Sequence, residues 1–169
     1  MGYNYIYDKL WYEMCQAKFM ARYFSLLIAK RRIIYKILQI ASIVIATLGV
    51  ILFRYDYNFS YIALSIVTLI LVTSYILPAF IPSPEMILKI ENTVTFYSKK
   101  FVELEKLWRQ WRKCEISEKD LSDSVYEIME QNIPHETAID SFLTCNDEKI
   151  WNKSKEFTDT YFKNVYKTE

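Results

Sequence analysis

Glycine, proline and histidine are scarce in this chain, which holds 2 Gly, 4 Pro and 1 His in 169 residues. A protein of strands and tight turns uses glycine and proline at most of its connections, so the composition argues against a β-sheet fold. The sequence also lacks GxGxxG, P-loop and GxSxG motifs, which leaves no converging set of catalytic groups. We therefore expect an all-α protein that is not an enzyme and binds no cofactor.

Cysteine is present in an odd number, as Cys15, Cys114 and Cys145, with no CxxC spacing and no histidine beside it. This pattern predicts neither a disulfide framework nor a metal site. We interpret the three as reduced thiols facing the cytosol. The lone His135 follows Pro134 at an expected helix start, where a capping or surface role is favoured over proton transfer.

Two apolar runs stand out in a chain that is 52% hydrophobic. Residues 33–53 are apolar except for Lys36, Gln39 and small hydroxyls, and residues 59–81 carry no charge. About twenty apolar residues cross a hydrocarbon core roughly 30 Å thick. The short segment 54–58 is long enough only for a turn. The sequence therefore predicts a transmembrane hairpin with spans 33–53 and 59–81, and a hairpin buried in a protein without membrane spans is the disfavoured alternative.

A basic cluster precedes the first run and consists of Lys30, Arg31, Arg32 and Lys36. Further lysines follow the second run, and the turn carries one arginine, so the positive-inside rule places both termini in the cytosol. Membrane orientation by itself explains the cluster. Binding of an anionic lipid or a nucleotide phosphate is the alternative that the same residues leave open.

Two polar or small-residue faces run along the predicted spans. The first face consists of Ser42, Ala46 and Gly49. Small residues let helix backbones approach closely in lipid, so this face predicts helix packing. The second face consists of Ser65, Thr68 and Tyr75. It is a candidate pore lining in an oligomer, and the alternative is that its hydroxyls bond to carbonyls four residues back in their own helix.

Apolar stripes continue outside the predicted membrane segment. Residues 1–32 form an expected amphipathic helix with Leu10, Met14, Ala17, Ala21, Phe24 and Ile28 on one face. Residues 83–115 form a heptad helix with the seam Ile87, Ile90, Val94, Tyr97, Phe101, Leu104, Trp108 and Trp111. The two stripes can pair within one chain as a stalk or between subunits. The seam position of the two tryptophans favours packing over stacking on nucleic acid.

The last segment, residues 117–169, predicts short helices. Ser117 and Asp120 resemble a capping box at the start of one helix, and Pro134 is expected to end it. Two further helices are expected near residues 136–143 and 148–166. The fold class we expect is thus an all-α membrane protein, in which a two-span hairpin extends into a cytosolic stalk with short C-terminal helices.

This arrangement resembles the bacterial SLATT family over roughly the first two-thirds of the chain. The resemblance lies in the order of helices and in the segments Ala21-Arg22-Tyr23-Phe24 and Lys30-Arg31-Arg32. It implies a two-span effector of nucleotide-signalling or reverse-transcriptase-linked antiphage systems, which homo-oligomerises and permeabilises the bacterial inner membrane in abortive infection. The alternative is a membrane-anchored adaptor or accessory subunit that recruits a cytosolic or membrane partner without forming a pore.

Overall fold

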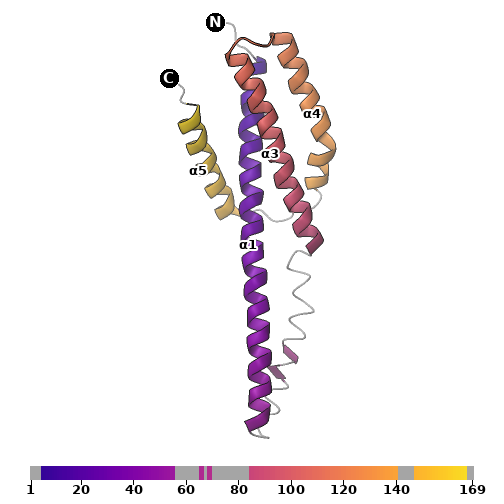
Figure 1. The fold of residues 1–169 in the computed structure, drawn as a ribbon, viewed down its shortest axis with the longest axis vertical. Coiled ribbons are helices and arrows are strands. Elements are labelled where there is room, and N and C mark those ends of the chain that lie inside the picture. The colour runs from indigo at the N-terminus through magenta and orange to yellow at the C-terminus, as the bar shows by residue number, and fades with distance from the viewer. Residues whose placement is uncertain (1–4, 56–64, 67, 70–83, 141–146, 167–169) are drawn as a thin grey trace. The chain divides into compact units, whose positions relative to one another are not determined.

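The computed structural model describes residues 5–55, 65–66, 68–69, 84–140 and 147–166. These ranges contain the helices α1 (Tyr5–Tyr55), α3 (Pro84–Arg112), α4 (Glu118–Asp140) and α5 (Glu148–Val165) (Figure 1). The all-α part of the fold prediction is therefore confirmed for the described residues. The chain divides into two compact units: a helical bundle formed by Met1–Leu27 with Ile90–Glu169, and a second unit formed by Ile28–Lys89.

The predicted membrane crossing is not supported by these helices. No helix in the described ranges combines the length and hydropathy needed to cross a membrane. The predicted transmembrane hairpin is therefore wrong, and so are the description as a membrane protein and the multi-pass location in the inner membrane. The first run, residues 33–53, belongs to α1. Most of the second run, residues 59–81, lies outside the described residues.

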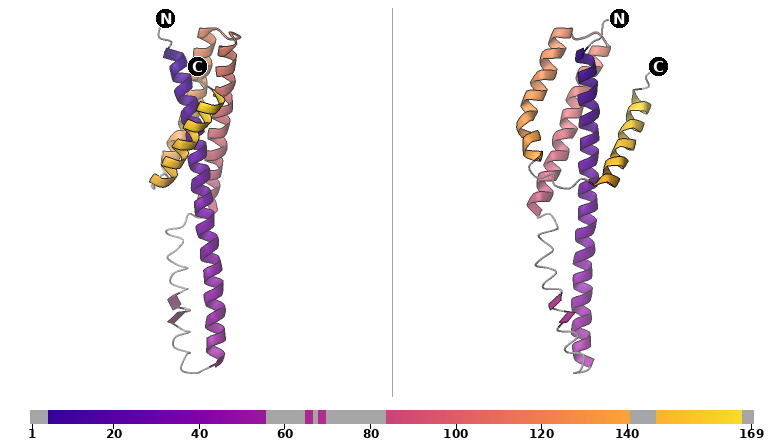
Figure 2. Two further views of the ribbon diagram at one scale, coloured as in Figure 1. Left: turned by 90° about the vertical axis from the view of Figure 1, so that its left-hand side faces the viewer. Right: turned by 180° about the vertical axis from the view of Figure 1, so that it is seen from behind.

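Within the bundle, the first half of α1 lies between α3 and α5 (Figures 1 and 2). Helices α1 and α3 pair in the same chain, and Phe24 stacks on Tyr97 with ring centroids 5.9 Å apart. The pair buries the apolar residues Leu10, Met14, Ala17, Phe24, Leu27, Ile90, Tyr97, Phe101 and Leu104. Each large side chain removed from water contributes about 1.5–3 kcal/mol, so this interface forms the core of the bundle.

An ion pair also lies in the bundle. The Lys100 ammonium is 2.9 Å from the Glu13 carboxylate, and their side chains are only 4% and 11% exposed. Two charges this deeply buried must be paired, because an isolated ion loses its hydration without compensation. The pair therefore links α1 to α3 by a contact that the apolar stripes do not predict.

Helix α4 begins at a cap that resembles the predicted one. The Asp120 N–H donates to Ser117 Oγ at 3.2 Å, and the Ser117 hydroxyl donates to the Asp120 carboxylate at 2.6 Å. Leu121 and Val125 are fully buried. The predicted break at Pro134 is wrong, because α4 continues through it to Asp140. Proline removes one helical N–H, and the intact turns on either side keep the helix continuous.

The turn between α3 and α4 explains where α3 ends. Glu115 N–H donates to the Gln110 carbonyl at 2.9 Å, and Cys114 between them has a left-handed backbone with φ of 56°. This is the Schellman arrangement, which satisfies carbonyls that a helix end otherwise leaves without donors. The position favours glycine, and Cys114 occupies it at a conformational cost.

Candidate interaction surfaces

A long apolar surface is exposed on α1 in the second unit. Nine large apolar or aromatic side chains between residues 33 and 48 are each 37–66% exposed. Four of them, Ile33, Ile37, Ile40 and Val44, follow a 4-3-4 spacing and therefore share one helix face. We call these four residues the apolar stripe. Contiguous apolar surface of this kind marks a site of interaction.

The residues predicted to pack helices lie close to this stripe in sequence. The Ser42 hydroxyl donates to the Leu38 carbonyl at 2.9 Å, which is a bond within its own helix. Ala46 and Gly49 also lie in α1, and their side chains are outside the described part of the structure. Of the predicted pore face, Ser65 and Thr68 are exposed and Tyr75 lies outside the described residues. The roles assigned to these residues stay predictions.

The basic cluster precedes and borders the stripe on α1. Lys30, Arg32 and Lys36 are exposed, and Arg31 is half-buried. Residues 28–55 contain no acidic side chain, so the second unit carries only positive charge within its described part of α1. A cationic rim beside an apolar face keeps charges in water while the apolar face is covered.

The predicted heptad seam of α3 divides into buried and partly exposed positions. Ile90, Tyr97, Phe101 and Leu104 are buried, whereas Ile87, Val94, Trp108 and Trp111 are partly exposed. The Trp108 ring contacts Trp11 of α1 at 6.0 Å and Tyr166 at 4.7 Å between centroids. This ring therefore packs against α1 and the end of α5.

Helix α5 meets α1 and α3 through aromatic rings and cations. The Lys18 ammonium lies 4.0 Å from the Tyr161 ring centroid, and the Arg22 guanidinium lies 4.4 Å from that of Phe157. Trp151 packs edge-on against Phe19 at 4.6 Å between ring centroids. Cation–π contacts of this type are worth about 0.5–2 kcal/mol each, depending on exposure. We call the face formed by Lys18, Phe19 and Arg22 of α1 with Phe101 and Trp108 of α3 the α5-binding face.

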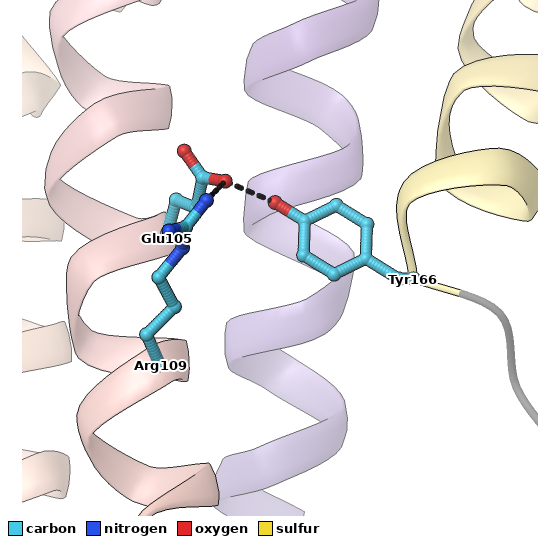
Figure 3. Close-up of polar contacts among 3 residues, drawn as sticks. All are labelled: Glu105, Arg109 and Tyr166. Atoms are coloured by element: carbon cyan, nitrogen blue, oxygen red, sulfur yellow. Dashed lines mark hydrogen bonds and ion pairs between the residues drawn. The ribbon is translucent and has the colours of Figure 1, made fainter.

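The end of α5 is held by three polar side chains (Figure 3). The Tyr166 hydroxyl donates to Glu105 Oε1 at 2.6 Å, and the Arg109 guanidinium donates to the same oxygen at 2.8 Å. Burial raises the pKa of Glu105, but the bonds from Tyr166 and Arg109 together lower this pKa below its ordinary value. Burial and the hydrogen bond to Glu105 raise the pKa of Tyr166. The phenol therefore stays neutral and the carboxylate stays charged, which is the combination that gives a strong hydrogen bond.

Two polar atoms beneath α5 lack partners. Arg22 Nε and Trp108 Nε1 are buried and have no hydrogen-bond partner within the described part of the chain. A buried donor without an acceptor costs about 1–3 kcal/mol. Both side chains contact α5, through Phe157 and Tyr166, so the fit between α5 and its binding face is incomplete.

Helix α5 contributes a buried stripe of four residues at intervals of four: Ile150, Ser154, Thr158 and Phe162. The hydroxyls of Ser154 and Thr158 donate to the carbonyls four residues back at 2.7 and 2.8 Å. Both hydroxyls are thereby satisfied inside their own helix, and their small size lets the α5 backbone come close to its neighbours. The buried stripe is therefore half polar in composition.

Sequence reasoning missed the contact between Tyr166 and Glu105. The two residues are 61 positions apart, and neither belongs to a motif or to a predicted seam. Sequence reasoning also missed the cation–π contacts of Lys18 and Arg22, because the rings belong to a distant helix. Periodicity identifies a face but not the side chain that lies opposite it.

The described residues contain no group of three or more His, Cys, Asp or Glu side chains that could hold a metal ion. Neither a family model, nor a curated protein, nor a solved structure matches this chain.

Proposed function

We propose that this chain is a non-enzymatic effector that acts by assembling with further copies of itself through the apolar stripe of α1. The observation that carries the proposal is the exposure of that stripe: Ile33, Ile37, Ile40 and Val44 are 50–62% exposed. Covering a half-exposed side chain of this size contributes on the order of 1 kcal/mol. The stripe therefore gains free energy from a partner that presents a matching apolar face.

A second copy is the partner that the spacing favours. The 4-3-4 pattern is the spacing of a coiled-coil seam, and Ile and Val are residues that such seams use at their core positions. A partner recognised mainly by its charge would place acidic residues against the basic cluster. The apolar stripe is uncharged, so its partner does not need acidic residues. The apolar stripes of two or more copies can bury one another's side chains without any other partner.

Growth arrest in antiphage defence is the biological outcome we propose for this assembly, since the resemblance to the SLATT family implies it. A nucleotide-signalling enzyme or a reverse transcriptase of such a system is the proposed source of the activating signal. Membrane permeabilisation, which the same resemblance implies, stays a prediction. The helices of the bundle would receive the signal, and the second unit would assemble in response.

The test is a pair of variants that place the same new side chain one residue apart. Ile40→Glu puts a carboxylate on the stripe, and Gln39→Glu puts it on an exposed position beside the stripe. We expect the first variant to lose assembly in sedimentation and to lose growth arrest on expression, and the second to keep both. Equal assembly of both variants would refute the proposal. If neither the parent chain nor its variants assemble, and the parent chain cross-links to a different protein, the result would favour the alternative function as an adaptor.

A further inference from the structure

The interface between α5 and the rest of the bundle differs in kind from the interface between α1 and α3. Leu10, Met14, Phe24, Ile90 and Leu104 make the α1–α3 contact a core of aliphatic and aromatic side chains. Aromatic rings, phenylalanine included, together with lysine and arginine instead dominate the contact with α5. Aromatic residues and arginine are the types enriched where separate proteins recognise each other. The α5-binding face thus has the composition of a recognition surface.

The α5-binding face also tolerates water. Lys18 and Arg22 are half-buried while α5 is in place, and the Arg109 side chain is 64% exposed. Their charged heads become hydrated when α5 leaves, and Arg22 Nε then gains the hydrogen-bond partner it lacks in the bundle. Removal of α5 therefore hydrates the cations of this face, and it also uncovers Trp11 and Phe101, which the α5 of a second copy covers again.

We propose that this face of α1 and α3 is a helix-binding surface, and that the α5 segment of a second copy binds it in exchange for the resident α5. The resident helix shows which sequence fits: Ile150, Ser154, Thr158 and Phe162 at intervals of four, followed by Tyr166 at the same interval. Every contact described above between α5 and another helix reaches α1 or α3, so the α5 of another copy supplies all of these contacts unchanged. Exchange of an identical element between copies is a low-cost route to association.

The chain segment that joins α4 to α5 determines when exchange takes place. Asp140 ends α4 and Glu148 begins α5, so a short segment keeps the resident helix beside its face. Such a linker gives an effective concentration on the order of millimolar, which a free copy seldom matches. Exchange therefore needs either weakened docking of the resident helix or copies held close together. Exchange of α5 does not depend on the apolar stripe, because the stripe belongs to the second unit.

The first experiment uses the full chain and a fluorescent synthetic peptide of residues 147–166. Ser154→Arg in the full chain places a long cation at a fully buried position of α5, which displaces the resident helix. Lys155→Arg places the same side chain at the neighbouring exposed position and serves as the control. We expect the peptide to bind the Ser154→Arg chain at least about tenfold more tightly than the control chain, as judged by anisotropy. A peptide that itself carries Ser154→Arg should not bind.

A second variant with a smaller change controls for misfolding of the Ser154→Arg chain. Tyr166→Phe removes the hydroxyl bond to Glu105 and keeps the ring, so it should tighten peptide binding about tenfold without changing the helical circular dichroism. If both variants fold and neither binds the peptide more tightly than the control chain does, the proposed helix-binding surface is overturned.

The second experiment tests exchange between copies. Donor-labelled and acceptor-labelled full chains are mixed in the Ile40→Glu background, which silences the apolar stripe. We expect energy transfer to develop over time with native α5 when the total concentration approaches the roughly millimolar effective concentration set by the α4–α5 segment, and to vanish when both copies carry Ser154→Arg. Absence of energy transfer at high concentration, in the native-α5 mixture, overturns the exchange. Because the stripe is silenced, this result is independent of the proposed assembly through α1.

Discussion

Removal of Lys100 should destabilise the bundle more than any other single change to a polar side chain. The Lys100 ammonium and the Glu13 carboxylate are 2.9 Å apart and both nearly inaccessible to water. At an effective dielectric constant near 20, their attraction is about 6 kcal/mol, and the loss of hydration of the two ions offsets most of it. The intact pair therefore contributes little net stability. Lys100→Met, however, leaves the Glu13 charge buried without its partner, which costs about 3–5 kcal/mol.

Urea unfolding monitored by the fluorescence of Trp11 and Trp108 measures this loss, because both rings lie in the bundle. A cost near 3 kcal/mol should lower the midpoint by about 2 M. The decisive comparison is the double variant Glu13→Leu with Lys100→Met, which removes both charges. We expect it to recover most of the stability that Lys100→Met loses. A double variant as unstable as the single one would refute the reasoning, since it would show that packing around Lys100, not the orphaned charge, causes the loss.

Three further outcomes follow from local geometry. The pKa of Glu105 is lower in the folded chain than in the unfolded chain, so the unfolded state takes up the proton first as the pH falls. The stability from this carboxylate is therefore fully present above the unfolded pKa and is lost as the pH falls through the lower, folded pKa. Between pH 6 and pH 3, Glu105→Gln should lose less stability than the parent, and equal losses would contradict the assignment. Cys114→Gly should raise the stability by about 1 kcal/mol, seen as a higher Tm, because glycine adopts the left-handed φ without strain; an unchanged or lower Tm would count against it. Burial, and to a smaller extent the Asp159 charge, raise the pKa of Cys15 to about 11. Iodoacetamide at pH 8 should therefore modify the exposed Cys114 at least about tenfold faster than Cys15. Mass spectrometry of the alkylated peptides would measure the two rates.

The helices could be predicted from the sequence because their causes are local. Scarce glycine and proline predict continuous helices, and the 4-3 spacing of Leu10, Met14 and Ala17 identifies the face of α1 that is buried. The cap at Ser117 is equally local, since donor and acceptor are three residues apart. Pro134 shows the limit of such rules, because α4 continues through a residue that locally favours an end.

The apolar run in α1 was predicted from the sequence, but its environment was not. Hydropathy and periodicity describe the side chains of a segment, and they do not say what those side chains contact. For this reason the same residues, 33–53, predicted a membrane span that the structure does not support. The structure instead shows Ile33, Ile37, Ile40 and Val44 exposed along one face.

The contacts that distinguish this bundle depend on tertiary structure alone. Glu13 meets Lys100, and Glu105 meets Tyr166, across separations in sequence that no local pattern links. Whether a charged residue is buried or hydrated depends on the helix that lies against it, and only the folded chain brings that helix into place. Local sequence patterns therefore account for the helices and their apolar faces, whereas packing between distant segments selects the polar side chains that join them.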